Sequence, residues 1–150
     1  MENQPVKVID HSAFAGKWYS LYSIPTLMDK NWKQTTETYT LRDDEHFDVY
    51  TTYHKEGKPE EKSITSKLFF DEEQPDGDMK AQFFWPFKIG YWVIELADDY
   101  NYVVIGHPDK KYLFIMAREP KMDPTLLKDI IERCRQMGYD TGSLVSQEHS

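Results

Sequence analysis

Short runs of alternating apolar and polar residues dominate the chain between residues 18 and 118. Clusters of Asp, Gly and Pro, which are typical of tight turns, separate these runs. Successive side chains of a strand point to opposite faces, so each run predicts a β-strand with one face buried. The eight predicted strands cover residues 18–24, 35–42, 47–54, 63–70, 79–85, 90–97, 101–106 and 112–118.

Most connections between these runs are a few residues long, which favours antiparallel pairing of strands that are neighbours in sequence. A row of eight such strands leaves two exposed edges unless the first and last strands also pair. We therefore predict an all-β fold, an eight-stranded antiparallel up-and-down barrel over residues 16–118. The chain length suits a single domain, residues 1–150, in which residues 1–10 form an N-terminal segment.

The region after the last strand has a different period. Apolar side chains recur at helical spacing between Leu126 and Cys134, with charged residues on the other face. Asp123 is placed to cap the helix, Pro124 suits its first position, and Gly138 suits its end. The pattern predicts one C-terminal α-helix over residues 123–137, packed against the outside of the barrel.

The longest connection, residues 25–34, carries Leu27, Met28 and Trp32 and is too apolar for a solvated loop. We expect it to form a lid over the barrel mouth, and packing on the outer wall is the alternative. The aromatic cluster of Trp85, Phe87 and Trp92 near a strand end has three possible interpretations. The cluster lines the mouth, forms a dimer contact, or packs only against its local surroundings.

Alternation also predicts which side chains face the barrel interior. The inward set mixes apolar carbon with tyrosine hydroxyls, small residues and one carboxylate. An ordinary core would hold fewer polar tips, because each buried hydroxyl needs a partner. The mixture suits an amphipathic ligand. The predicted ligand-binding residues are Ser20, Tyr22, Leu27, Met28, Glu37, Tyr39, Val49, Thr51, Tyr53, Ile64, Ser66, Leu68, Ala81, Phe83, Tyr91, Val93, Val103, Ile105, Tyr112 and Phe114.

The inward carboxylate, Glu37, has two interpretations. In an apolar cavity, desolvation would raise its pKa unless tyrosine hydroxyls stabilise the charge. A neutral Glu37 would donate to a ligand carboxylate, and a charged one would favour a cation or amine. The alternative is a solvated position at the mouth. The direction of Glu95 is left open, because its strand is apolar on both faces.

Composition narrows the function further. The formal net charge of −8 argues against nucleic acid and against docking to anionic lipid. The first ten residues lack the apolar stretch of a signal peptide, and no cysteine near the start would carry a lipid anchor. These features fit a cytoplasmic protein, or a periplasmic or outer-membrane-associated one whose leader was removed.

Other chemistries have little support in the sequence. The five histidines are scattered without the spacing of a metal site, and no Gly-x-Ser-x-Gly motif occurs. The single cysteine excludes an intrachain disulfide. We therefore predict no catalytic residue, no metal and no cofactor.

Several motifs together resemble the lipocalin family, in particular the bacterial lipocalins and their apolipoprotein D-like relatives. Gly16-Lys17-Trp18 is similar to the Gly-x-Trp of the first lipocalin strand, and Arg118 to the arginine that ends the eighth. The block between strands six and seven, usually Thr-Asp-Tyr, is Asp98-Asp99-Tyr100 and lacks the threonine. Three longer stretches resemble the bacterial branch, namely residues 38–44, 83–87 and 112–118. The resemblance covers about residues 6–145.

The resemblance implies structural roles for Gly16, Trp18, Tyr100 and Arg118. Trp18 would plug the closed end of the barrel with Arg118 stacked across its indole, and Gly16 would sit where the chain turns into the first strand. The resemblance also implies binding, storage or transport of a fatty acid, lysophospholipid or similar amphipath. Bacterial relatives are often outer-membrane lipoproteins and can form homodimers. The resemblance therefore leaves two partners open: a membrane that supplies the lipid, and a second copy of the chain in a homodimer.

Two alternative functions remain. One is an enzyme on the same barrel, an isomerase, lyase or de-epoxidase in which Glu37 and a nearby tyrosine form an acid/base pair. The other is a haem or tetrapyrrole binder that uses an inward histidine or tyrosine.

Overall fold

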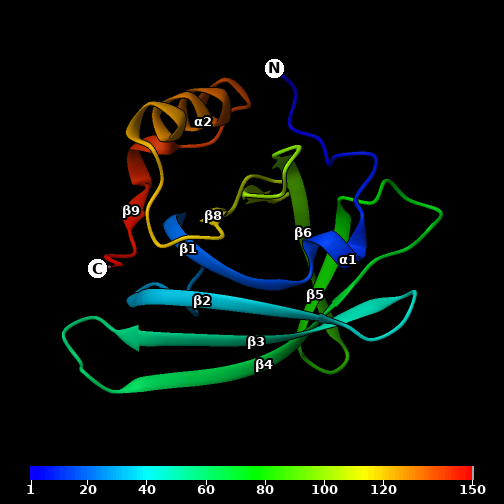
Figure 1. Ribbon diagram of the computed structural model, residues 1–150, viewed down its shortest axis with the longest axis horizontal. Coiled ribbons are helices and arrows are strands. Elements are labelled where there is room, and N and C mark those ends of the chain that lie inside the picture. The colour runs from blue at the N-terminus through cyan, green and yellow to red at the C-terminus, as the bar shows by residue number, and fades with distance from the viewer. Residues whose placement is uncertain (150) are drawn as a thin grey trace.

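Eight antiparallel strands close into a barrel in the computed structural model, which describes residues 1–149 (Figure 1). Each strand pairs with its neighbour in sequence, and the first strand pairs with both the second and the eighth. This closure removes the exposed edges that a flat sheet would keep. The strands are β1 (Gly16–Ile24), β2 (Trp32–Leu41), β3 (His46–Lys55), β4 (Glu61–Phe69), β5 (Asp78–Phe84), β6 (Phe87–Leu96), β7 (Tyr102–Gly106) and β8 (Leu113–Ala117). The predicted fold class is confirmed.

One irregularity in β1 changes the direction of its side chains. The pairing of β1 with β8 shifts between Ser20 and Tyr22, as expected for a β-bulge. A bulge adds a residue to one strand, so side chains beyond it exchange faces. Tyr22 and Ile24 consequently pack on the outer wall.

The C-terminal helix, α2 (Pro124–Gln136), lies outside the barrel wall as predicted (Figure 1). The Asp123 side chain accepts a hydrogen bond from the Leu126 amide at 3.1 Å and caps the helix. Ile130 and Cys134 are buried on the barrel-facing side. They belong to an outer apolar cluster with residues of β6, β7 and β8, including Ile94.

Three short elements were not predicted: α1 (His11–Phe14), η1 (Thr141–Ser143) and β9 (Val145–Ser146). Each is too short to leave a periodic signal in the sequence. β9 adds to β1 through the pair Ser23 and Val145, so the C-terminal tail lies against the barrel. No helix within residues 1–149 is both long and apolar enough to cross a membrane.

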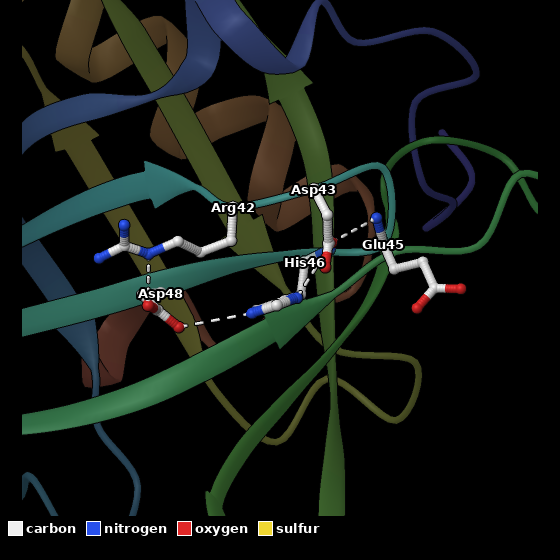
Figure 2. A network of polar contacts seen from close by, with 5 residues as sticks. All are labelled: Arg42, Asp43, Glu45, His46 and Asp48. Carbon is white, nitrogen blue, oxygen red and sulfur yellow. Dashed lines mark hydrogen bonds and ion pairs between the residues drawn. The ribbon is translucent and has the colours of Figure 1, made fainter.

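The turn between β2 and β3 is held by a polar network (Figure 2). The Asp43 carboxylate accepts hydrogen bonds from the backbone amides of Glu45 and His46, at 2.8 and 2.9 Å. These bonds lower the pKa of Asp43, and the bond from the Glu45 amide has the largest effect. Asp48 accepts from Arg42 Nε at 2.6 Å and lies 3.5 Å from His46 Nε2. The network lies at the turn that sets the register of β2 on β3.

Candidate functional site

A cavity of about 380 Å³ occupies the barrel interior and opens at one end. Of the eight barrel strands, all except β7 border the cavity, and most of the wall is apolar. The β2–β3 register places Glu37 opposite Thr51 and Tyr39 opposite Val49, all four on the wall. This size and this mixture are typical of a small-molecule pocket.

The connection between β1 and β2 lies at the cavity mouth. Leu27, Met28 and Trp32 line the cavity, and the Leu27 side chain is 96% exposed. Within this loop, Asp29 accepts hydrogen bonds from the backbone amide and the hydroxyl of Thr26. These local bonds fold the loop over itself, so that its apolar side chains border the opening.

Glu37 is the most unusual group of the wall. Its carboxylate accepts a hydrogen bond from the Thr51 hydroxyl at 2.6 Å. Burial raises its pKa to about 7, the Thr51 bond opposes this shift, and the nearby Asp29 charge adds to it. The side chain therefore faces the interior rather than a solvated rim. It titrates close to neutral pH.

Tyrosine hydroxyls lie near this carboxylate. Tyr39 and Tyr91 share a hydrogen bond across the barrel, and the Tyr112 hydroxyl donates to the Gly90 carbonyl. Burial raises the pKa of Tyr39 and Tyr91 well above the usual value of 10, and the charge of Glu37 contributes to both shifts. These hydroxyls are neutral at physiological pH and already have partners inside the barrel.

Fifteen of the twenty residues predicted to bind a ligand line the cavity. They are Ser20, Leu27, Met28, Glu37, Tyr39, Val49, Thr51, Ile64, Ser66, Leu68, Ala81, Phe83, Tyr91, Tyr112 and Phe114. Whether they contact a ligand stays a prediction.

The other five do not line it. The interior position predicted for Tyr22 is wrong, because the bulge in β1 turns it toward the outer cluster. Val93, Val103 and Ile105 do point inward, but they are fully buried in the inner core and have no surface on the cavity. Tyr53 is buried and stacks on Trp32, with ring centroids 3.6 Å apart.

Sequence reasoning left out several wall residues. Some had a usable signal: Met116 shares a face with Phe114, and Trp32 lies in the predicted lid. Gln147 had none, since it comes from the C-terminal tail and bonds to the Thr35 hydroxyl at 2.7 Å. The full set that was left out is Thr26, Asp29, Trp32, Thr35, Lys67, Phe84, Phe87, Ile89, Met116 and Gln147.

The closed end holds the four predicted structural residues. The Arg118 guanidinium lies 3.7 Å from the centre of the Trp18 ring and donates to the carbonyls of Lys17, Ala13 and Tyr100. The Trp18 indole donates to the Phe14 carbonyl at 2.9 Å. Gly16 has a φ of +102°, and a β-carbon there would lie 3.3 Å from Arg118.

Tyr100 ties this end to the N-terminal segment. Its backbone φ is +59°, and its hydroxyl accepts a hydrogen bond from the Asp10 amide at 2.9 Å. Because its carbonyl also accepts from Arg118, Tyr100 links the β6–β7 turn to both the N-terminal segment and the end of β8.

The remaining ionisable candidates lie away from the cavity. Glu95 points outward and forms a two-point ion pair with Arg133 of α2, with both distances 2.8 Å. Within residues 1–149, no histidine lines the cavity wall. The same described residues hold no group of three or more His, Cys, Asp or Glu side chains arranged to bind a metal. A haem binder would have to use an inward tyrosine here.

Comparison with known proteins agrees with this architecture. A family model described as a lipocalin-like domain matches residues 9–149. The outer membrane lipoprotein Blc of Vibrio cholerae is 30% identical over 143 residues, covering 95% of this chain and 84% of that protein. Temperature-induced lipocalin-1 of Arabidopsis thaliana is 28% identical over 152 residues, covering 95% and 81%.

Solved structures support the fold. Insecticyanin from the tobacco hornworm Manduca sexta superposes with a TM-score of 0.77 at 20% identity, covering all of this chain and 86% of that one. Lobster apocrustacyanin A1 gives a TM-score of 0.74 at 16% identity, covering 91% and 78%. With the barrel, the Trp18–Arg118 contact and the family match over nearly its whole length, this chain is a member of the lipocalin family.

Proposed function

We propose that this protein binds a small lipophilic molecule in its barrel cavity, for storage or transport. The observation that carries the proposal is the open cavity of about 380 Å³, whose wall is mainly apolar and includes a few polar groups. Burying an alkyl tail there would contribute about 0.8 kcal/mol per CH₂ group. Membership of the lipocalin family supports the same function. Fatty acids, lysophospholipids and similar amphipaths are the proposed ligands.

Filling the cavity tests this proposal. Ala81 and Ser66 are small wall residues on β5 and β4. Ala81→Trp and Ser66→Arg should each weaken binding of dodecanol at least tenfold, measured by calorimetry. The neighbouring exposed positions give matched controls, since Lys80→Trp and Thr65→Arg introduce the same side chains outside the barrel. Unchanged affinity in both cavity variants would place the ligand elsewhere and overturn the proposal.

We infer that the ligand enters from a lipid surface through the apolar residues around the mouth. The exposed fractions of Leu27, Phe84, Phe87 and Ile89 are 96%, 74%, 75% and 42%, and all four also line the cavity. We call these four residues the mouth rim. A molecule that passes between a bilayer and the cavity would stay in contact with apolar surface. The net charge of −8 favours a neutral, zwitterionic bilayer.

A location next to a bilayer follows from the same proposal. The relatives from Vibrio cholerae and Escherichia coli are named outer membrane lipoproteins. These names support a proposed location in the cell envelope. Cell fractionation, with detection of the protein in membrane and soluble fractions, tests it.

A further inference from the structure

The acidic side chains of the cavity indicate which head group a ligand would carry, which the apolar wall does not. Glu37 lies on the interior wall of β2, directly opposite Trp18 of β1 in the strand register. Trp18 fills the closed end, so Glu37 lies next to that end rather than at the mouth. One carboxylate oxygen accepts from Thr51, and among the described residues the other has no hydrogen-bond donor.

The surroundings of Glu37 provide no compensating cation. Asp29 faces it from the mouth loop, and the charge of Asp29 repels that of Glu37. Tyr39 on the same strand and Tyr91 on β6 contribute only neutral hydroxyls. β1 and β3 contribute the hydroxyl-bearing residues Ser20 and Thr51 to the nearby wall. Lys67 also touches the wall, but it is an exposed residue of β4 and has no part in the shift of Glu37. The cavity thus holds two acids and lacks an interior base.

We propose that the cavity selects an amphiphile with a positively charged amine head group over one with a free carboxylate, and that Glu37 receives this head group. This inference rests on the proposed function, because it requires a ligand in the barrel. An ammonium group would donate to the free oxygen of Glu37 and offset the repulsion between Glu37 and Asp29. A carboxylate would add a third negative charge to an enclosed site of low dielectric.

A hydroxyl head group would supply the hydrogen-bond donor but not the positive charge. It would donate one hydrogen bond to Glu37, yet it would leave both acids without a counter-charge. A buried carboxylate that gains an ammonium partner recovers part of its desolvation cost. The presence of Asp29 beside Glu37 therefore favours a cation over a neutral donor. The tail of such a ligand would extend toward the apolar residues of the mouth.

Three ligands with the same tail separate these cases: dodecylamine, dodecanol and dodecanoate. Their affinities for the intact protein would be measured by calorimetry at pH 6 and pH 8. We expect dodecylamine affinity to rise about tenfold between these values, because the deprotonated fraction of a carboxyl with a pKa of about 7 rises about tenfold. Dodecanoate affinity should fall over the same interval, and dodecanol affinity should change least.

The variant Glu37→Gln keeps the size of the side chain and its acceptor for Thr51 but cannot titrate. It should remove the rise for dodecylamine and the fall for dodecanoate. Glu61→Gln, an exposed carboxylate on β4, removes the same formal charge outside and should leave both slopes unchanged. The opposite slopes in the wild-type protein test the inference even if Glu37→Gln fails to fold.

The outcomes distinguish this inference from the proposed function. If dodecanol binds, and dodecanoate binds at pH 8 as tightly as dodecylamine or more tightly, the amine preference is overturned and the proposed function stands. Parallel pH profiles for amine and carboxylate would also overturn it. Failure of all three ligands to bind would overturn the proposed function itself.

Discussion

The two ends of this barrel are built from the same strands but differ in what their apolar residues do. At the closed end, Phe14, Trp18 and Phe47 have no exposed surface, and Arg118 donates to four backbone carbonyls around them. At the open end, the apolar side chains of the mouth rim stay exposed. Packing at the first end contributes stability, whereas exposure at the second leaves apolar surface available to another molecule.

The two ends also differ in how their buried charged groups are paired. At the closed end, the Arg118 guanidinium lies on an aromatic face and donates to carbonyl oxygens. The cavity above it holds Glu37 with one partner and a second acid nearby. A stabilising site and a binding site thus differ in whether the protein itself satisfies the buried charge.

The largest expected effect is at the closed end. Trp18→Ala should lower the free energy of unfolding by about 3–5 kcal/mol, because it removes a fully buried aromatic side chain and leaves a cavity. Urea denaturation followed by circular dichroism would measure it. Trp85→Ala is the matched control, since Trp85 is 85% exposed and its loss should cost less than about 0.5 kcal/mol. Equal losses in the two variants would refute the contrast between the ends.

A smaller, pH-dependent effect is expected for Glu37→Gln without ligand. Burial raises the pKa of Glu37 from 4.5 to about 7, so the folded protein keeps this proton while the unfolded chain loses it. The wild-type free energy of unfolding should therefore fall between about pH 4.5 and 7 by at most about 3 kcal/mol relative to the variant. Denaturation of both proteins at pH 5 and pH 8 would measure the difference. A constant difference at the two pH values would mean that Glu37 is solvated.

The smallest effect on stability is expected at the mouth rim. Changing Phe84 and Phe87 to serine should alter the free energy of unfolding by no more than about 0.5 kcal/mol each, because both side chains are mostly exposed. The double variant Phe84→Ser/Phe87→Ser should slow the uptake of a fluorescent lipid from phosphatidylcholine vesicles severalfold. This effect should exceed the loss of affinity for dodecanol in solution, which is expected because both side chains also line the cavity. Stopped-flow fluorescence would follow the uptake.

The control for this experiment is Tyr50→Ser, an exposed aromatic on the outer face of β3. Uptake at the wild-type rate by the double variant would contradict loading through the rim. Self-association of the wild-type protein that the double variant abolishes, seen by analytical ultracentrifugation, would instead identify the rim as a contact between two copies.

Local patterns in the sequence determined most of the architecture. Alternation in eight runs, with turn residues between them, predicted the strands, because a pleated strand exposes and buries alternate side chains. Short connections predicted antiparallel pairing in sequence order. Asp123 and Pro124 predicted the start of α2, since a capping side chain and the first helical position have strong residue preferences. The same alternation placed Glu37 on the inward face but left a solvated position at the mouth open, and in the structure Glu37 lines the cavity.

The tertiary structure decided what alternation leaves undefined. Alternation gives the face of a residue but not its depth, so Val93, Val103 and Ile105 point inward yet fill the core instead of lining the cavity. The bulge in β1 depends on how β1 pairs with β8, a strand about ninety residues away, and it alone turned Tyr22 outward. Gln147 reaches the wall because β9 pairs with β1. The electrostatic coupling of Glu37 to Asp29 likewise depends on the β1–β2 connection, which borders the cavity, and such contacts exist only once the barrel has closed.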